Sequence, residues 1–402
     1  MAEKGAKILI TRRAAASGLV LGAGALAATC APARTNGDRP GAFQDAAAAE
    51  RGAPSRATAL TLERLEHLRA LVGAPALAAA GEGTRGKDLN LAAGLRMRGK
   101  ETPVGGDDVW HFGSITKSMT ATLIARSVEA GLLAWDDTIF SRLGDLAPDM
   151  RDDYRALTLR HLLSHRAGLA TETLNFGTIR LPMEERDPRD SRRLIARDAL
   201  RNAPVEPAER TFHYSNTGYV VACAMLEAAC GAPWEALLRR HVFEPLGMAN
   251  AGFGAPKWPR TQDGDVGEPV GHASWISDSV TPHPPGSFYS DLPAAWGPAG
   301  RVHAPLADMV RYLNAHRDRT SLLRTETWDL LHTAPFGGDY AFGWQVRSEG
   351  LWHNGSNSLW YAEVLVDRRR GISAVSVCND GRIEHVAPSV YAALMGVREA
   401  VA

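Results

Sequence analysis

A serine and a lysine lie one helical turn apart in the segment "HFGSITKSMT", residues 111–120. Lysine is rare here: only six of the 45 basic residues are Lys, and Ser114–Lys117 is the only Ser-x-x-Lys pair. The i, i+3 spacing places both side chains on one face of a helix. A serine hydroxyl becomes a good nucleophile when a neighbouring base takes its proton. A buried lysine can lose its charge and act as that base, whereas an arginine stays charged.

The expected position of Ser114 in its helix favours the same chemistry. Ser114 follows Gly113 and stands at the predicted N-terminus, where unpaired N–H groups and the helix dipole favour developing negative charge. A simpler interpretation remains open for the pair alone. In it, Ser114 only caps the helix and Lys117 is a solvated surface residue.

A second group of suitable residues is "YSN", Tyr214 to Asn216, which follows a polar loop and precedes a predicted helix. The phenol of Tyr214 can relay a proton, and the amide of Asn216 can bind a carbonyl or hold the lysine. The similar "YLN" at Tyr312 to Asn314 falls inside a predicted amphipathic helix. We therefore assign that copy to structure.

A third group is "WHNGS", which precedes or opens a predicted strand near the end of the chain. Gly355 would let the backbone approach a substrate closely. The N–H of Ser356 could act as an oxyanion donor opposite the N–H of Ser114. Taken alone, a histidine such as His353 is more often an ordinary loop residue.

One other pattern suggests a metal. "HLLSH", His161 to His165, has the histidine spacing of a zinc-protease helix, but Leu162 stands where the glutamate base would be. We interpret these histidines as structural, and we expect no metal or cofactor.

Together, Ser-x-x-Lys, Tyr-Ser-Asn and His-x-Gly-Ser, in this order, resemble the serine β-lactamase and penicillin-binding protein superfamily. The branch most similar to the chain contains class C β-lactamases, D-alanyl-D-alanine carboxypeptidases and related esterases. The resemblance extends from about Leu60 to the C-terminus. It implies that Ser114 is the acylated nucleophile, Lys117 its base and Tyr214 a proton relay to the leaving group. The substrate-binding residues that it implies are Asn216, His353, Gly355 and Ser356.

The third motif departs from the Lys-Thr-Gly of the antibiotic-hydrolysing members, because His353 stands at the lysine position and Asn354 at the threonine position. A histidine is only partly protonated at neutral pH. We therefore expect a weaker, pH-dependent hold on a substrate carboxylate. This departure favours an esterase or a peptidase over a dedicated β-lactamase.

The resemblance therefore implies a serine hydrolase that forms an acyl-enzyme on an ester, amide or β-lactam bond. Carboxylesterase, D-Ala-D-Ala carboxypeptidase and class C β-lactamase are the candidate types. The alternatives are a penicillin-binding sensor that is acylated once, or a catalytically silent protein of the cell envelope. The chain has zero net charge and no basic block, so we expect a small-molecule substrate and no nucleic acid. We also expect a monomer.

Hydrophobic periodicity predicts the elements that position these residues. The chain begins with a helix and a hairpin, has mostly helices in the middle, and returns to strands and a last helix. This order predicts an α/β (α+β) fold in which an antiparallel sheet from both termini is interrupted by a helical insertion. The resemblance implies a β-lactamase/transpeptidase-like fold. The predicted elements are helices at 62–72 and 386–397 and strands at 75–80, 89–95, 342–346, 360–367 and 371–379. The predicted domains are a sheet domain of 58–135 and 296–402 and a helical domain of 136–295 with substrate-pocket loops.

The N-terminal residues resemble an export signal. Four basic residues precede the uncharged segment 14–28, which is shorter than the about 20 residues of a membrane span. We interpret 1–33 as this signal and 34–57 as a flexible linker, and we expect an exported, periplasmic or envelope-associated protein. The twin arginine resembles a Tat signal, and Cys30 resembles a lipoprotein cysteine, so a lipid anchor at Cys30 is a further possibility. A disordered alanine-rich tail is the alternative.

Overall fold

The fold is that of a computed structural model of the 402-residue chain. It describes residues 58–172, 187–256, 267–274, 279–287 and 290–402. The expected export signal, the linker and Cys30 lie outside the described residues and stay predictions. Residues 42–402 form one compact unit, and the account below concerns the described part of this unit.

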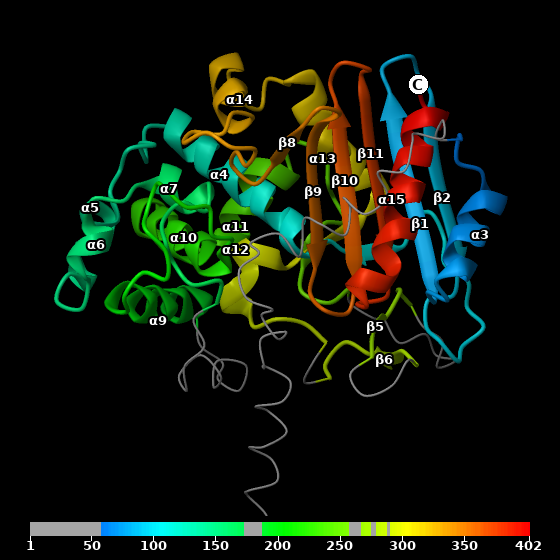
Figure 1. The fold of residues 1–402 in the computed structure, drawn as a ribbon, viewed down its shortest axis with the longest axis horizontal. Helices are drawn as coiled ribbons and strands as arrows, with labels where there is room; N and C mark the ends of the chain where they lie inside the picture. The colour runs from blue at the N-terminus through cyan, green and yellow to red at the C-terminus, as the bar shows by residue number, and fades with distance from the viewer. Residues whose placement is uncertain (1–57, 173–186, 257–266, 275–278, 288–289) are drawn as a thin grey trace, which may run out of the picture. The chain divides into compact units, whose positions relative to one another are not determined.

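A six-stranded antiparallel sheet joins the two ends of the described chain (Figure 1). Its order is β2-β1-β11-β10-β9-β8. The strands are β1 (Ala76–Gly83), β2 (Asp88–Gly94), β8 (Gln345–Arg347), β9 (Gly350–Ser356), β10 (Tyr361–Asp367) and β11 (Ile372–Cys378). Leu77 of the N-terminal hairpin lies opposite Cys378 of β11. The predicted sheet from both termini is therefore confirmed.

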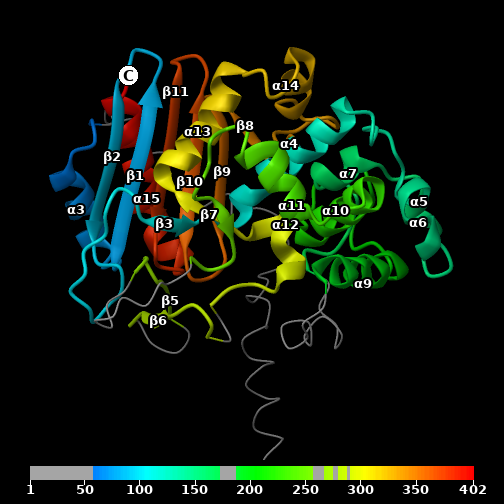
Figure 2. The ribbon, with the colours of Figure 1, turned by 180° about the vertical axis from the view of Figure 1, so that it is seen from behind.

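Helices cover both faces of this sheet. Figures 1 and 2 show α3 (Leu62–Leu71) and α15 (Ile383–Ala400) on one face and α13 (Leu306–Asp318) on the other. Strands β10 and β11 are buried at every position, as expected for strands with both faces covered. Val364 belongs to the core cluster that contains α13, and its neighbour Leu365 to the one that contains α15. Neighbouring residues of β10 therefore face opposite sides of the sheet, because side chains alternate along a strand.

The middle of the described chain is mostly helical and lies beside the sheet (Figures 1 and 2). Its helices are α5 (Ile139–Arg142), α6 (Asp152–Arg155), α7 (Leu159–Leu163), α9 (Pro188–Arg201), α10 (Asn216–Cys230) and α11 (Trp234–Leu238), with the shorter η2 (Gly144–Leu146) and η4 (Arg239–Phe243). The predicted division into a sheet domain and a helical domain stays a prediction.

Short elements connect the two regions. They are β3 (Val109–His111), η1 (Gly113–Ile115), β4 (Gly252–Phe253), β5 (Gly271–Ala273), β6 (Thr281–His283), η5 (Ala294–Trp296), α12 (Gly297–Gly300), β7 (Val302–Pro305) and α14 (Thr325–Leu331). Strands β3, β7 and β4 form a small antiparallel sheet. Phe112 donates a backbone hydrogen bond to Val302 at 3.0 Å. The start of η1 is thus fixed to β7.

Helix α10 contains two of the cysteines. Cys223 and Cys230 lie seven residues apart in it, about 10 Å along the axis, and are free, as is Cys378. Of the described helices, none is by itself long and apolar enough to cross a membrane. The bent pair Asn216–Cys230 and Trp234–Phe243 passes that test only when both members are taken together.

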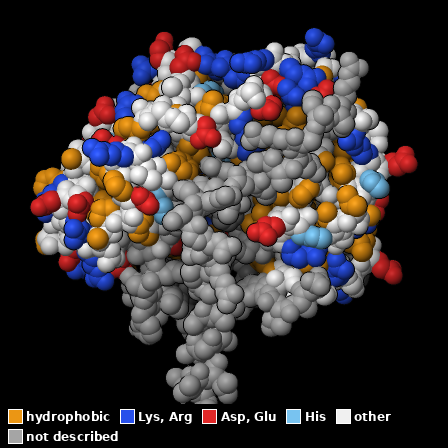
Figure 3. All heavy atoms as spheres, in the orientation of Figure 1, with side chains coloured by type: hydrophobic (Ala, Val, Ile, Leu, Met, Phe, Trp, Pro, Cys, Tyr) orange, Lys and Arg blue, Asp and Glu red, His pale blue; other side chains and the backbone are white. Residues whose placement is uncertain are grey.

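Charges of both signs are mixed on the described surface. The chain has 45 Lys+Arg and 45 Asp+Glu residues, and Figure 3 shows described basic and acidic side chains interspersed on one face. Many form exposed pairs, such as Arg197 with Asp149 at 2.6 Å. Exposed pairs contribute about 0–1 kcal/mol each. The stability of the fold therefore comes mainly from its core.

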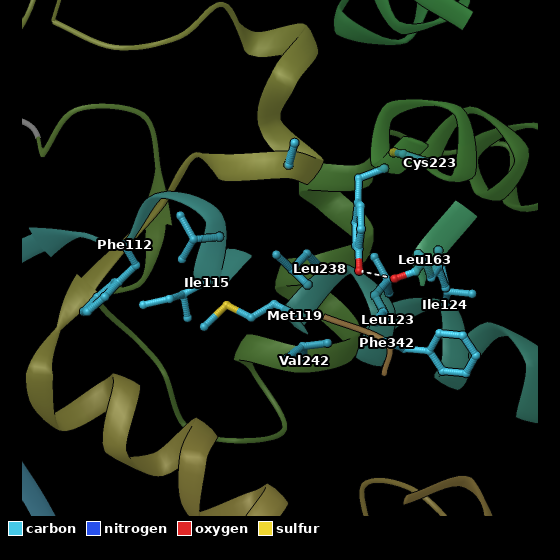
Figure 4. Close-up of a cluster of buried hydrophobic side chains, with 14 of the residues drawn as sticks. Phe112, Ile115, Met119, Leu123, Ile124, Leu163, Cys223, Leu238, Val242 and Phe342 are labelled. Atoms are coloured by element: carbon cyan, nitrogen blue, oxygen red, sulfur yellow. Dashed lines mark hydrogen bonds between the residues drawn. The ribbon is translucent and has the colours of Figure 1, made fainter. Parts of the chain in front are cut away.

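Helix α4 (Thr116–Glu129) runs through that core and is buried on nearly every side. Figure 4 shows Met119 and Leu123 among side chains from other elements, including Leu238. Its polar residues bond to carbonyls of the preceding turn: Ser118 Oγ donates to Ile115 O at 2.8 Å and Thr122 Oγ1 to Ser118 O at 3.0 Å. A helix packed in this way holds its first turn in a fixed place.

Candidate active site

Ser114 lies in η1, the turn between β3 and α4. Gly113 has φ +49°, in the left-handed region that favours glycine, and a Cβ there would lie 2.3 Å from Ser356 N. A Cβ at Gly355 would lie 2.7 Å from Ser114 N. The two glycines therefore let η1 and β9 meet backbone to backbone. This contact brings the N–H groups of Ser114 and Ser356 together, as an oxyanion hole requires.

Lys117 lies one turn further along and is fully buried. Its Nζ is 3.0 Å from Ser114 Oγ, 2.6 Å from Asn216 Oδ1 and 2.7 Å from Ala299 O. Asn216 Nδ2 donates to Glu172 at 3.1 Å, which directs the amide oxygen toward the lysine. Burial lowers the pKa of Lys117 well below its ordinary value, although the Glu172 carboxylate acts in the opposite direction.

The contacts of the lysine determine what its neutral form can do. A neutral amine has two N–H groups and one lone pair. Asn216 Oδ1 and Ala299 O are acceptors only, so they occupy the two N–H groups. The lone pair is left for the third neighbour, Ser114 Oγ. The geometry therefore allows Lys117 to take the serine proton directly.

Tyr214 lies in the loop before α10, which begins where the Ser215 side chain accepts the N–H of Gly218 at 3.0 Å. The ring centroid of Tyr214 is 4.8 Å from Lys117 Nζ. Burial raises the pKa of Tyr214, and a hydrogen bond with Ser114 acts in the opposite direction without reversing the shift. The phenol therefore keeps its proton and can donate it. A lysine with a lowered pKa and a protonated tyrosine therefore flank the serine.

His353 of β9 is buried and 3% exposed. Its Nε2 is 2.9 Å from Tyr340 Oη. Burial lowers the pKa of His353 to about 3, and the Lys117 charge acts in the same direction. The ring is neutral at neutral pH, so the expectation of a partly protonated histidine is wrong. A buried histidine beside a lysine cannot keep a proton without a compensating anion.

The other side chains of this strand are also engaged. Asn354 Nδ2 donates to Tyr361 Oη at 3.3 Å. Ser356 Oγ accepts the N–H of Ser358 at 2.9 Å. The positions that the resemblance assigned to substrate binding on β9 therefore present a neutral ring and backbone groups.

His165 and Tyr340 also lie at this site, although sequence reasoning did not place them there. The ring centroid of His165 is 4.3 Å from that of Tyr214 and 4.7 Å from that of Tyr340. His165 Nδ1 accepts the N–H of Ser215 at 3.0 Å, so it fixes the start of the Tyr-Ser-Asn motif. Its sequence context, "HLLSHRAGL", suggested only a zinc look-alike.

The other look-alikes are structural. His161 Nδ1 accepts the N–H of Thr158 at 3.0 Å, and its Nε2 is 3.0 Å from Glu209. Tyr312 lies in α13 and donates to Ser118 at 3.0 Å. The assignment of "YLN" to a helix is therefore confirmed. His165 likewise makes a structural contact, since its Nδ1 accepts the N–H of Ser215 at 3.0 Å.

The loops of 136–295 that we predicted to shape the substrate pocket lie partly outside the described residues. Just after this range, α12 contributes Ala299 O to Lys117. A Cβ at Gly300 would lie 3.8 Å from Ser114 N. The chain that directly follows these loops thus lies against the serine, while their role in a pocket stays a prediction.

Comparison with known proteins gives concordant results. The model of the beta-lactamase family matches residues 64–393. Penicillin-binding protein 4 of Amycolatopsis lactamdurans is 27% identical over 327 residues, which cover 76% of this chain and 81% of that protein. Esterase EstB of Burkholderia gladioli is 29% identical, with coverages of 63% and 68%.

Solved structures share the fold. D-amino acid amidase from Ochrobactrum anthropi SV3 superposes with a TM-score of 0.67 at 20% identity, and the match covers 85% of this chain and 98% of that one. An octameric penicillin-binding protein homologue from Pyrococcus abyssi superposes with a TM-score of 0.64 at 20% identity, covering 82% and 76%. The match to the family model begins in α3 and ends in α15, so it spans both halves of the sheet.

Proposed function

Because the chain belongs to the beta-lactamase family of serine hydrolases, we propose that it hydrolyses uncharged ester or amide substrates through an acyl-enzyme on Ser114. The contacts of Ser114 with Lys117 and Tyr214 support the catalytic part of this proposal. The neutral environment of His353 supports the choice of substrate, and it is the observation that carries the proposal.

The proposed cycle uses groups already in contact. Lys117 takes the proton of Ser114 Oγ as this oxygen attacks the carbonyl carbon. The oxyanion lies between the N–H groups of Ser114 and Ser356. Tyr214 donates its proton to the leaving oxygen or nitrogen and regains one from Lys117. Water then attacks the acyl-enzyme by the same route and releases the acid product and free Ser114.

The preference for uncharged substrates follows from the charge at β9. A carboxylate is held best by a cation with hydrogen-bond donors. His353 is neutral, and Tyr340 occupies its Nε2. A substrate carboxylate placed there would lose its hydration without gaining a cation. The esterase and the D-amino acid amidase named above show that this family and this fold include enzymes for esters and amides.

The test compares two substrates that differ by one charge. An N-acyl-D-alanyl-D-alanine and the corresponding N-acyl-D-alanyl-D-alaninol, in which CH2OH replaces the carboxylate, are hydrolysed side by side at the same amide bond, with Ser114→Ala as the blank. We expect a clearly higher kcat/KM for the uncharged compound, and we expect His353→Lys to shift the preference toward the charged one. Preference of the wild type for the free carboxylate would contradict the proposal.

Two further assays separate the rival activities. Sustained turnover of a chromogenic cephalosporin, lost in Ser114→Ala, would establish a β-lactamase. A stoichiometric burst that stops after one equivalent would establish an acylatable sensor. We expect neither with the wild-type protein, whereas short-chain aryl esters should be turned over continuously.

We also propose that the protein is exported and works as a monomer. The basic start and the uncharged segment of residues 1–33 support export. The octameric relative makes the second point worth testing early. Light scattering of the mature protein gives its mass, and mass spectrometry of membrane and soluble fractions shows whether Cys30 carries a lipid.

A further inference from the structure

A buried carboxylate outside the three motifs joins the segments that form the site. The side chain of Asp291 is 6% exposed. Its oxygens lie 3.3 Å from His111 Nε2, 3.2 Å from Arg301 Nε and 3.1 Å from Asn357 Nδ2. These three partners come from β3, from the residue before β7 and from the residue after β9. One side chain therefore contacts three elements that are far apart in the sequence.

On the nucleophile side, His111 connects Asp291 to the turn that holds Ser114. His111 Nδ1 accepts the N–H of Gly113 at 3.1 Å. A neutral imidazole that accepts at Nδ1 carries its proton at Nε2, and this nitrogen faces Asp291. The carboxylate lies 3.3 Å from this nitrogen, outside hydrogen-bond geometry, and its charge favours this orientation and tautomer of the ring that supports the residue before Ser114.

Asn357 and Arg301, the other two partners of Asp291, each lie close in sequence to a residue of the candidate site. Asn357 directly follows Ser356, whose backbone nitrogen lies against Gly113 of η1. Arg301 follows Gly300 and lies two residues after Ala299, the carbonyl of which accepts from Lys117. Burial acts to raise the pKa of Asp291, but His111, Arg301 and Asn357 lower it to about 2. The group is therefore ionised at any pH at which the enzyme would work.

We infer that Asp291 is a positioning residue, which holds the N–H groups of Ser114 and Ser356, the two donors of the oxyanion hole, in a fixed position relative to each other. The inference rests on the proposed acyl-enzyme function. Asp291 touches no reacting atom, so it acts through its partners His111, Asn357 and Arg301. Misplacement of a catalytic group by about 1 Å can cost up to about 100-fold in rate. The loss should affect the tetrahedral state more than substrate binding, so kcat should fall while KM changes little.

The test uses phenylboronic acid, because its binding does not depend on the natural substrate. Ser114 Oγ forms a bond to the trigonal boron, the serine proton moves to Lys117 Nζ, and no group leaves. An oxygen of the tetrahedral adduct then occupies the oxyanion hole. Calorimetry gives the dissociation constant, and Ser114→Ala shows how much of the binding is covalent.

The variants are Asp291→Ala, Asp291→Asn and the control Asp308→Asn. Asp308 is also buried, 2% exposed, and holds Asn250 N at 3.0 Å and Arg311. We expect the dissociation constant to rise roughly 10- to 100-fold in Asp291→Ala, in parallel with the fall in kcat. Asp291→Asn keeps an oxygen for His111 and should lose less. The control should lose stability but bind the boronic acid like the wild type.

The outcomes separate the inference from the proposed function. A folded Asp291→Ala with wild-type boronic acid affinity would overturn the inference, as would an equal loss in Asp308→Asn. If Asp291→Ala does not fold, Asp291→Asn decides the question by the same criterion. A wild type that binds the boronic acid through Ser114 but hydrolyses no uncharged ester or amide would refute only the substrate proposal.

Discussion

The proposed role of Lys117 as a base depends on its burial. Its Nζ contacts Ser114, Asn216 and Ala299, and burial disfavours the ammonium form. The same burial works against folding, because a lysine whose pKa is lowered in the folded state is more easily protonated in the unfolded state. Such a cost is typical of functional residues.

Substitution of Lys117 by methionine should therefore remove activity without removing the fold. Methionine fills a similar volume but has no basic nitrogen. We expect kcat/KM on an aryl ester to fall by about 100- to 10,000-fold, the usual contribution of a general base. The matched control is Lys87→Met, since Lys87 is exposed and its Nζ donates to Ala402 O at 2.9 Å. Retained activity in Lys117→Met would contradict the assigned role.

The pH dependence of the rate should report Lys117 and not His353. The pKa of Lys117 is lowered, so the active neutral amine is lost as the pH falls through that value. His353, with its pKa near 3, contributes no change around neutrality. We expect kcat/KM to decline on the acidic side, and His353→Gln to leave the position of that limb unchanged. A limb that disappears in His353→Gln would show that the histidine is the titrating group.

At the scale of elements, strands β9 and β10 share a buried carboxylate on the face opposite the serine. Glu363 accepts from Trp352 Nε1 and from Tyr361 Oη, each at 3.0 Å. Burial raises the pKa of Glu363 to about 7, while its hydrogen bonds act to lower it. The folded chain therefore holds a proton there that the unfolded chain loses above its ordinary pKa of 4.5.

This difference predicts how stability changes with pH. Between pH 4.5 and about 7 the folded state binds more protons at Glu363, so the free energy of unfolding should decrease as the pH rises. The contribution lost is up to about 3 kcal/mol, from about 1.4 kcal/mol per pKa unit. Urea unfolding at a series of pH values checks this. Glu363→Gln should remove the slope, and an unchanged slope in the variant would assign it to other groups.

Elements with their own periodicity were predictable from the sequence. The β1–β2 hairpin, β10, β11 and α15 each carry a local apolar pattern that matches the observed segment. The strand expected at 342–346 was only partly correct, because β8 covers Gln345–Arg347. Gly343 instead packs on α4, where a Cβ would lie 2.5 Å from Ser118 Cα. That contact depends on tertiary packing, which a local pattern does not contain.

The difference between a local pattern and tertiary packing also explains which residues of the candidate site could be predicted from the sequence. Ser114 and Lys117 could be paired in advance, because three residues along a helix fix their relation. Tyr340 and Asp291 could not, since folding brings them to the site from irregular segments without a diagnostic spacing. The charge of His353 could not be predicted from the sequence either, because it depends on burial and on Lys117. Residue type suggests the chemistry, and packing decides the protonation state.

At the scale of the molecule, the helical region is tied to the segment that carries Asp291. Arg192 of α9 is fully buried and bonds to Glu227 of α10 at 2.7 Å and to Glu235 of α11 at 3.0 Å. It also donates to Ala294 O at 3.1 Å, three residues after Asp291. One cation thus connects three helices with the chain that leads to the oxyanion hole.

Removal of this cation should weaken the helical region and the site together. Arg192→Ala leaves the carboxylate of Glu227 buried without its partner, which typically costs about 3–5 kcal/mol. The control, Arg197→Ala, breaks an exposed pair with Asp149 and should cost about 0–1 kcal/mol. Urea unfolding followed by tryptophan fluorescence and by residual esterase activity measures both effects. Coincident, equally shifted transitions are expected for Arg192→Ala, because the helices and the Asp291 segment share this residue. An activity transition that keeps its wild-type midpoint would show that the site does not depend on the helical region.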